Sequence, residues 1–181
     1  MKLVVGLGNY PLEYKMTRHN AGFIVVDELY DRFGNDFEQF HENKKFIANI
    51  TEGELFGEKT ILLKPKTFMN LSGDSVSKVM KFYKISPKDL IVIHDELDFS
   101  FGVVKPTLSH NPAGHNGIKS INSYIHDTYS RIRVGIGRPK EQSYDISNYV
   151  LSKFSKEEQE HLDNVVDKAI DILKSIFNGT I

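Results

Sequence analysis

Polar residues that could carry acid–base chemistry stand at the ends of apolar runs and in the loops before helical patterns. Asn9 follows the first apolar run, His19 precedes a helical pattern and Asn70 precedes a second one. His94-Asp95-Glu96 ends a third apolar run, and His115-Asn116 lies in a loop that contains glycine. A histidine can take a proton from water near neutral pH, a carboxylate can hold its tautomer, and asparagine amides can donate to a developing oxyanion. His19, Asp95 and the three asparagines could therefore supply acid–base catalysis without a side-chain nucleophile or a metal.

Spacing alone leaves other interpretations of these polar residues open. Asparagine is common in turns and at helix N-caps, so Asn9, Asn20 and Asn70 could be purely structural. The segment that begins at Gly6 resembles a dinucleotide-binding turn, but Pro11 stands where that motif needs its third glycine. His110 and His115 have no third ligand at a suitable spacing, so we expect no metal and no cofactor.

Alternating strand and helix patterns must position these residues. Buried strands are predicted at 2–7 and 90–94, and further strands at 102–106 and 131–137. Residues 46–52 and 55–63 are predicted to form a hairpin that turns at Gly53-Glu54. Helices are predicted over 20–33, capped by Thr17 or Asn20, over 76–83, over 117–126, and after a Ser155/Glu158 capping box as far as 176. The alternation predicts one α/β domain over residues 1–181, with three layers (α/β/α) and helices on both faces of a mixed, twisted sheet.

Composition excludes several classes of protein. The chain has 181 residues, of which 40% are hydrophobic and 26% charged, a balance that suits one globular domain better than a disordered chain. No window approaches the roughly 18 apolar residues of a membrane helix, and the first residues do not resemble a signal peptide. We therefore expect a cytoplasmic protein with no membrane partner. The absence of cysteine removes disulfides, Cys-ligated metals and thiol nucleophiles.

The net charge of −1 conceals one strongly basic stretch. Residues 101–140 hold six basic residues and one acidic residue, a balance of +5. The six are Lys105, Lys119, Arg131, Arg133, Arg138 and Lys140. Such a stretch could form an anion-binding face, or it could be a solvated surface where basic residues cluster by chance.

Five segments, taken in order, resemble the motifs of the bacterial peptidyl-tRNA hydrolase family. They are Gly6–Asn9 with Tyr14 and Thr17–Phe23, then Lys64–Gly73, His94–Asp98, Gly114–Gly117 and Arg131–Pro139. The resemblance spans residues 2 to 139 and continues into an amphipathic C-terminal helix. It identifies the chain as a member of that family.

The resemblance implies an esterase that releases a peptide from the 3′ end of tRNA and so recycles tRNA from prematurely dropped peptidyl-tRNA. In such an enzyme His19 accepts the proton and Asp95 keeps it basic and oriented, while Asn9 and Asn70 place the water and the substrate carbonyl. The residues that the resemblance assigns to the terminal nucleotide, the peptide and the tRNA phosphates are Tyr14, Phe68, Met69, Asn70, Asn116, Lys105 and Arg133. The implied partner is the acceptor end of peptidyl-tRNA, and we expect a monomer.

Three departures from the family pattern are visible. Tyr10-Pro11 replaces the usual Pro-Gly after Asn9, and Thr107 stands where relatives often carry a second lysine. Pro112 lies in a loop, 108–113, that is usually rich in glycine, which predicts a stiffer gate over the substrate channel. Two other functions stay open from the sequence: a non-catalytic module that binds RNA ends, and a nucleotide-binding α/β protein. The His19 and Asp95 pair favours the esterase, because a pure binder needs no carboxylate-supported base.

Overall fold

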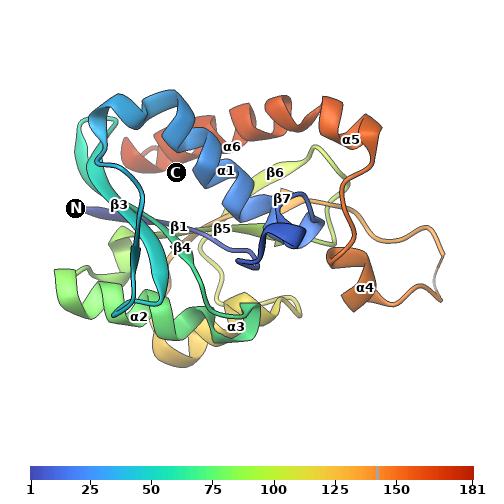
Figure 1. Cartoon of the computed structure of the whole chain (residues 1–181), viewed down its shortest axis with the longest axis horizontal. Helices are drawn as coiled ribbons and strands as arrows, with labels where there is room; N and C mark the ends of the chain where they lie inside the picture. The colour runs from blue at the N-terminus through green and yellow to red at the C-terminus, as the bar shows by residue number, and fades with distance from the viewer. Residues whose placement is uncertain (142) are drawn as a thin grey trace.

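A seven-stranded sheet forms the middle layer of the computed structural model, which describes residues 1–141 and 143–181 (Figure 1). Its strands are β1 (Lys2–Gly6), β2 (His41–Asn43), β3 (Ala48–Leu55), β4 (Glu58–Pro65), β5 (Leu90–Glu96), β6 (Val104–Thr107) and β7 (Ser130–Gly135). They lie in the order β2-β3-β4-β1-β5-β7-β6. The four strands β4, β1, β5 and β7 are parallel, and β2, β3 and β6 are antiparallel to their neighbours.

The direction of the strands determines which edge of the sheet can carry the functional side chains. The carboxyl ends of parallel strands meet at one edge of a sheet, and the loops there hold the side chains that bind ligands. Asn9 follows β1, Asn70 follows β4 and Asp95 is the second-last residue of β5. The mixed sheet predicted from the sequence is confirmed, and it brings these three residues to the same edge.

Helices cover both faces of the sheet, as predicted (Figure 1). The helices are α1 (Ala21–Phe33), α2 (Ser72–Tyr83), α3 (Asn116–Tyr124), α4 (Ile146–Val150), α5 (Lys156–Glu160) and α6 (Leu162–Phe177). α1 and α6 lie on one face, and α2 and α3 lie on the other. Within the described ranges, no helix is both long enough and apolar enough to cross a bilayer.

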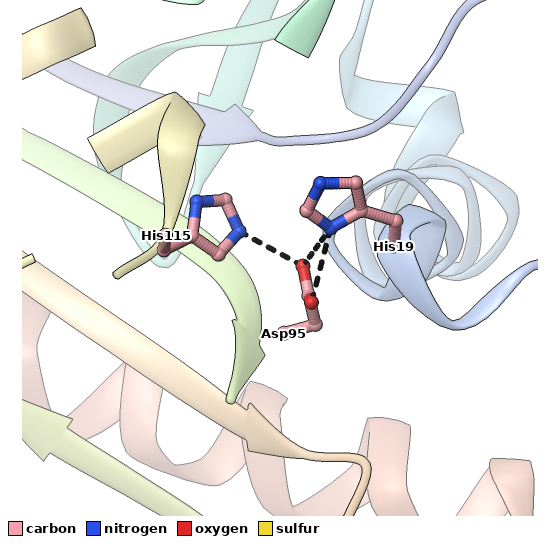
Figure 2. Close-up of side chains that lie close together, drawn as sticks. All are labelled: His19, Asp95 and His115. Carbon is pink, nitrogen blue, oxygen red and sulfur yellow. Dashed lines mark hydrogen bonds and ion pairs between the residues drawn. The ribbon is translucent and has the colours of Figure 1, made fainter. Parts of the chain in front are cut away.

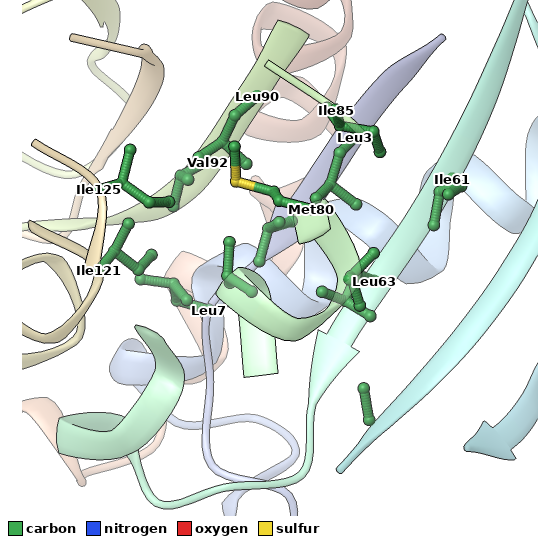
Figure 3. Close-up of a cluster of buried hydrophobic side chains, with 14 of the residues drawn as sticks. Leu3, Leu7, Ile61, Leu63, Met80, Ile85, Leu90, Val92, Ile121 and Ile125 are labelled. Carbon is green, nitrogen blue, oxygen red and sulfur yellow. The ribbon is translucent and has the colours of Figure 1, made fainter. Parts of the chain in front are cut away.

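Two apolar cores result from the alternation of side chains along the central strands. Leu3 and Val92 point to the α2–α3 side, where they pack with Met80, Ile121 and others (Figure 3). Val4 and Ile93 point to the α1–α6 side. A strand buried on both faces reads as a continuous apolar run, which is why β1 and β5 could be predicted from the sequence.

The predicted position of the hairpin turn is wrong. β3 runs on through Gly53 to Leu55, and the chain turns at Phe56-Gly57, both with positive φ (51° and 81°). Gly53 serves a different purpose, because a Cβ there would stand 2.3 Å from the Asp36 carbonyl oxygen and 2.5 Å from the Phe37 ring. The glycine that indicates a turn in the sequence is a point of close packing in the middle of a strand.

Helix ends differ from the prediction in two respects. Asn20 occupies the N-cap of α1, but neither its side chain nor that of Thr17 caps the helix. The Ser155/Glu158 capping box is confirmed, yet the predicted C-terminal helix divides at His161 into α5 and α6. The short elements β2 and α4 are not predicted from the sequence, because segments of three and five residues with mostly exposed side chains carry no periodic apolar signal.

Candidate active site

A buried histidine–carboxylate pair lies at the carboxyl edge of the sheet (Figure 2). His19 sits in the single 3-10 turn Arg18–Asn20 (η2), which leads into α1, and Asp95 comes from β5. The Nδ1 atom of His19 lies 2.9 Å from Oδ1 of Asp95 and 3.0 Å from Oδ2. The pair predicted from the sequence is therefore brought together, although its members stand 76 residues apart.

A second histidine, His115, binds the same carboxylate. Its Nε2 lies 2.9 Å from Oδ1 of Asp95, and its Nδ1 accepts hydrogen bonds from the backbone N–H groups of Gly117 (3.1 Å) and Ile118 (3.3 Å). Because Nδ1 is an acceptor, the hydrogen of neutral His115 must be on Nε2, which donates it to Asp95. His115 thus caps α3 with one ring nitrogen and holds Asp95 with the other.

The charges of the cluster settle which group is protonated. Burial disfavours ionisation of Asp95, but His19 and His115 hold the pKa of this carboxyl well below its usual range. Burial also lowers the pKa of His19, but the charge of Asp95 and the hydrogen bond to it outweigh burial and raise the pKa above its ordinary value. An ionised Asp95 accepts the Nδ1 hydrogen of neutral His19, which leaves the lone pair on Nε2. His19 can then act as a base through that atom.

Beneath His115 lies a third ring, that of His94. His94 is 1% exposed, and its ring centroid is 4.8 Å from that of His115. Its Nδ1 donates to the carbonyl oxygen of Asp95 at 2.7 Å. Burial, together with the neighbouring His115, holds the pKa of His94 well below its ordinary value. His94 therefore stays neutral, and the side chains that bind the Asp95 carboxylate are those of His19 and His115.

His19, Asp95 and His115 also place one ligand atom each within 4.8 Å of one another, which is close enough to enclose a metal ion. To bind a metal through Nε2, His115 would have to carry its hydrogen on Nδ1. That hydrogen would then point at the N–H groups of Gly117 and Ile118, which now donate to Nδ1. The donor set therefore fits two hydrogen bonds to a carboxylate better than it fits a metal.

Asn20 fixes the loop that carries Asn9. The backbone N–H of Asn9 donates to Oδ1 of Asn20 at 2.7 Å, and Nδ2 of Asn20 donates to the Asn9 carbonyl at 3.0 Å. These bonds hold the backbone of the altered Asn9-Tyr10-Pro11 turn, and Asn9 lines a cavity of about 460 Å³. The cavity extends along α1 between Phe23 and Lys64.

The predicted substrate-binding residues after β4 lie beside the start of α3. Met69 and Asn70 belong to the single 3-10 turn Met69–Leu71 (η4), which packs against α3. Met69 is buried against Gly117, where a Cβ would stand 2.6 Å from the methionine sulfur. Asn70 and Asn116 are exposed, as is Phe68 at 73%. This packing places the turn that carries Asn70 beside α3, whose first residue is Asn116.

Lys105 on the edge strand β6 and Arg133 on its neighbour β7 lie opposite each other. Both cations stand over the ring of Phe99, with Lys105 Nζ at 5.0 Å and Arg133 Cζ at 4.5 Å from its centroid. Arg133 is also 3.7 Å from Glu96. Tyr14 lies apart from these groups, half-buried in the 3-10 turn Leu12–Tyr14 (η1).

The loop at 108–113 is tied down from below by the buried side chain of Arg131. One guanidinium nitrogen, Nη2, donates to the carbonyl oxygens of Ser109 (2.6 Å) and Asn111 (2.9 Å). Asn122 donates to the His110 carbonyl at 2.6 Å. These bonds agree with the stiffer gate that Pro112 predicts, although its stiffness stays a prediction.

Sequence reasoning misses the roles of two residues in the site. It offers His115 as a polar loop residue or a metal ligand, and Asn20 as a helix cap. The available signal for His115 is its place directly before Asn116 at the start of a helical pattern, where an N-cap side chain is expected. No local signal joins Asn20 to Asn9, because their contact depends on how η2 packs beneath the β1 loop.

Comparisons with known proteins agree with one another. The family model for peptidyl-tRNA hydrolase matches residues 3–181. The chain is 47% identical over 169 residues to the peptidyl-tRNA hydrolase of Fusobacterium nucleatum, and the match covers 93% of this chain and 85% of that relative. It is 43% identical over 179 residues to that of Sinorhizobium fredii, with 99% and 73% covered. The crystal structure of peptidyl-tRNA hydrolase from Acinetobacter baumannii superposes with a TM-score of 0.91 at 38% identity, over 99% of this chain and 90% of that one.

Proposed function

The chain belongs to the peptidyl-tRNA hydrolase family and hydrolyses peptidyl-tRNA, and from that premise we propose that His19 is the general base of the reaction. One observation carries the proposal: Nδ1 of His19 is bound by Asp95 at 2.9 Å, so the free Nε2 is the proton acceptor. Family membership also favours the esterase over the RNA-end-binding module and the nucleotide-binding protein.

The proposed reaction proceeds through an activated water. Nε2 of His19 takes a proton as the water oxygen attacks the ester carbonyl, and the imidazolium that forms is stabilised by Asp95. The tetrahedral intermediate then expels the ribose 3′ oxygen, which recovers the proton from His19. The products are a free peptide carboxylic acid and tRNA with a free 3′ end.

Asparagine amides supply the remaining polar contacts in this proposal. Asn9 and Asn70 place the water and the carbonyl, and their side-chain N–H groups face the oxyanion as charge develops on it. Asn116 lines the same region beside His115. Tyr14, Phe68 and Met69 provide surface for the terminal nucleotide and the peptide.

Recognition of the tRNA is proposed for the edge of the sheet that β6 and β7 form. Lys105 and Arg133 are neighbours on these strands and can neutralise backbone phosphates of the acceptor stem. We expect the enzyme to act as a monomer in the cytoplasm, where it recycles tRNA from prematurely released peptidyl-tRNA. Sedimentation of the purified protein at several concentrations tests the monomer.

Incubation with two substrates tests the specificity of the reaction. We expect rapid release of tRNA from an N-acetylaminoacyl-tRNA or a peptidyl-tRNA, and slow release from the same aminoacyl-tRNA with a free amino group. Equal rates would contradict a site that distinguishes blocked from free acyl ends.

A further inference from the structure

Arg18, the residue directly before His19, holds a distant segment of the chain. Its side chain is buried, with 9% of the residue exposed. Nη1 donates to Oγ of Ser152 at 2.8 Å and to the Lys153 carbonyl oxygen at 2.5 Å, and Nη2 donates to the Glu158 carboxylate at 2.6 Å. All three acceptors lie more than 130 residues further along the chain.

Two aromatic rings enclose the same guanidinium. The centroid of the Tyr149 ring is 4.6 Å from Cζ of Arg18, and that of the Phe154 ring is 5.6 Å away. A planar guanidinium can stack on rings and donate several hydrogen bonds in its own plane, which a lysine ammonium cannot do. The partners of Arg18 therefore call for arginine in particular.

Backbone hydrogen bonds join the same two segments that the Arg18 side chain joins. The N–H of Arg18 donates to the Ser152 carbonyl at 3.0 Å, and the N–H of Phe154 donates to the Met16 carbonyl at 3.0 Å. Thr17 and Lys153 form an isolated antiparallel bridge between these bonds. We call residues 16–18 and 152–154, with the Arg18 side chain, the clasp.

The far side of the clasp is anchored in turn. The Glu158 carboxylate that accepts from Arg18 also accepts from the Ser155 backbone N–H at 2.6 Å, which closes the capping box of α5. The hydroxyl of Tyr149 donates to the Ile136 carbonyl at 2.8 Å, just after β7. The clasp thus joins the turn that carries His19 to a segment fixed at both ends.

We propose that Arg18 is a positioning residue that sets the orientation of the His19 ring toward Asp95 and the substrate. This inference rests on the proposed role of His19 as the base. The ring hydrogen-bonds Asp95 through Nδ1 and packs 5.0 Å from the His115 ring, and both contacts depend on where the backbone of η2 places His19. The clasp fixes that backbone at the adjacent residue, and small displacements of a catalytic group can reduce the rate of the chemical step strongly.

Three variants test the positioning role. Arg18→Lys keeps a positive charge and loses the planar contacts, and Glu158→Gln keeps a residue suited to the capping box while it loses the ionic partner. Lys153→Ala is the matched control, because only its backbone carbonyl belongs to the clasp and its side chain is exposed. We expect kcat on peptidyl-tRNA to fall about 10- to 100-fold in Arg18→Lys and less in Glu158→Gln, with KM changed less than about twofold. Lys153→Ala should match the wild type.

NMR titration of the histidine ring supplies a readout that does not depend on turnover. If the clasp orients His19, its weakened contact with Asp95 should move the pKa of His19 downward in Arg18→Lys. A fall in kcat that merely follows a loss of folded protein, with the His19 titration unchanged, would show that Arg18 is structural only. A rise in KM alone would make Arg18 a substrate-binding residue. Full activity of His19→Ala would instead overturn the proposed base, while the titration would still report whether Arg18 orients the ring.

Discussion

At the scale of single residues, the proposed mechanism sends the proton of the attacking water to Nε2 of His19. We expect His19→Ala to lower kcat by about 10²–10⁴-fold, because a general base typically contributes that much. Affinity for deacylated tRNA should change little, since the ring contributes no charge to phosphate binding. Single-turnover hydrolysis measures the chemical step, and wild-type rates in this variant would remove His19 from the mechanism.

In the proposed mechanism, Asp95 shapes the pH dependence of the reaction through the pKa of His19. His19 must be neutral to accept a proton, and its raised pKa places the acidic limb of the pH–rate profile above the pH expected for an ordinary histidine. Asp95→Asn removes the negative charge that raises this pKa, while burial, which lowers it, remains. We therefore expect a slower enzyme whose acidic limb lies at lower pH. A profile of kcat against pH for both proteins checks the sign, and an unmoved limb would place the partner of His19 elsewhere.

The tautomer of His115 leads to a third expectation. Nδ1 of His115 accepts two backbone hydrogen bonds, so Nε2 carries the hydrogen and donates it to Asp95. In this tautomer His115 has no free lone pair for a metal ion, and we expect hydrolysis without a metal. Treatment with EDTA followed by gel filtration should leave the hydrolysis rate unchanged, measured in a buffer that keeps the tRNA folded. Loss of activity that one added divalent ion restores, with the tRNA structure unaltered, would contradict this expectation.

At the scale of elements, the first turn of α1 lies almost in contact with the sheet. A Cβ at Gly22 would stand 2.2 Å from the Ile93 carbonyl oxygen and 2.4 Å from the Leu7 backbone nitrogen. Neither backbone group can move away without disturbing β1 or β5. The close approach places η2, and with it His19, directly over the end of β5.

Gly22→Ala should therefore be strongly destabilising. Overpacking typically costs about 1–3 kcal/mol of unfolding free energy, and contact with backbone belongs at the upper end, which corresponds to a fall in Tm of roughly 5–10 °C for a chain of this size. Gly34→Ala is the control, because Gly34 has a φ of −64° and a Cβ there would be 3.7 Å from the Tyr30 ring. Calorimetry of both variants decides the matter, and equal Tm values would contradict the close approach.

The same elements show what the sequence could and could not reveal. The strands β1 and β5 are predictable because burial on both faces makes them continuous apolar runs, and the capping box at Ser155 marks α5 through local hydrogen bonds. The turn of the β3–β4 hairpin is not predictable in this way. Gly53 suggests a turn in the sequence, but it is a glycine because it packs closely against Phe37, and no local pattern reveals a contact between separate segments. Likewise His19 and Asp95 can be chosen by residue type, whereas the link from His115 to Asp95 depends on how α3 lies against β5.

At the scale of the whole molecule, the basic residues of 101–140 do not form one surface. Arg131 is buried under the 108–113 loop, and Arg138 pairs with Asp98 at 2.6 Å. Lys105 and Arg133 are left side by side across β6 and β7. Lys119 and Lys140 are exposed on other parts of the chain, on α3 and beyond β7. We propose that the Lys105 and Arg133 pair, in which Arg133 has a longer 3.7 Å contact with Glu96, is the part of 101–140 that binds phosphate.

We expect Lys105→Ala combined with Arg133→Ala to weaken binding of deacylated tRNA and to flatten its salt dependence. The slope of log K against log salt should become shallower by roughly 0.7–0.9 for each phosphate that the variant no longer neutralises. Lys59→Ala combined with Lys81→Ala removes the same charge from exposed positions on β4 and α2, away from β6 and β7, and it serves as the control. An unchanged slope in the first double variant would leave the pair without a role in RNA recognition.

The pairing of residues 16–18 with residues 152–154 also has a consequence for the order in which the chain is made. The turn that carries His19 is synthesised more than 130 residues before the segment that pairs with it. A growing chain that stops before residue 152 lacks this segment, so it holds the histidine turn by one side only. The turn that carries His19 therefore gains its second support only after residues 152–154 have been made. Until then the unfinished enzyme is itself a peptide esterified to tRNA, and it belongs to the class of molecules that the finished one cleaves.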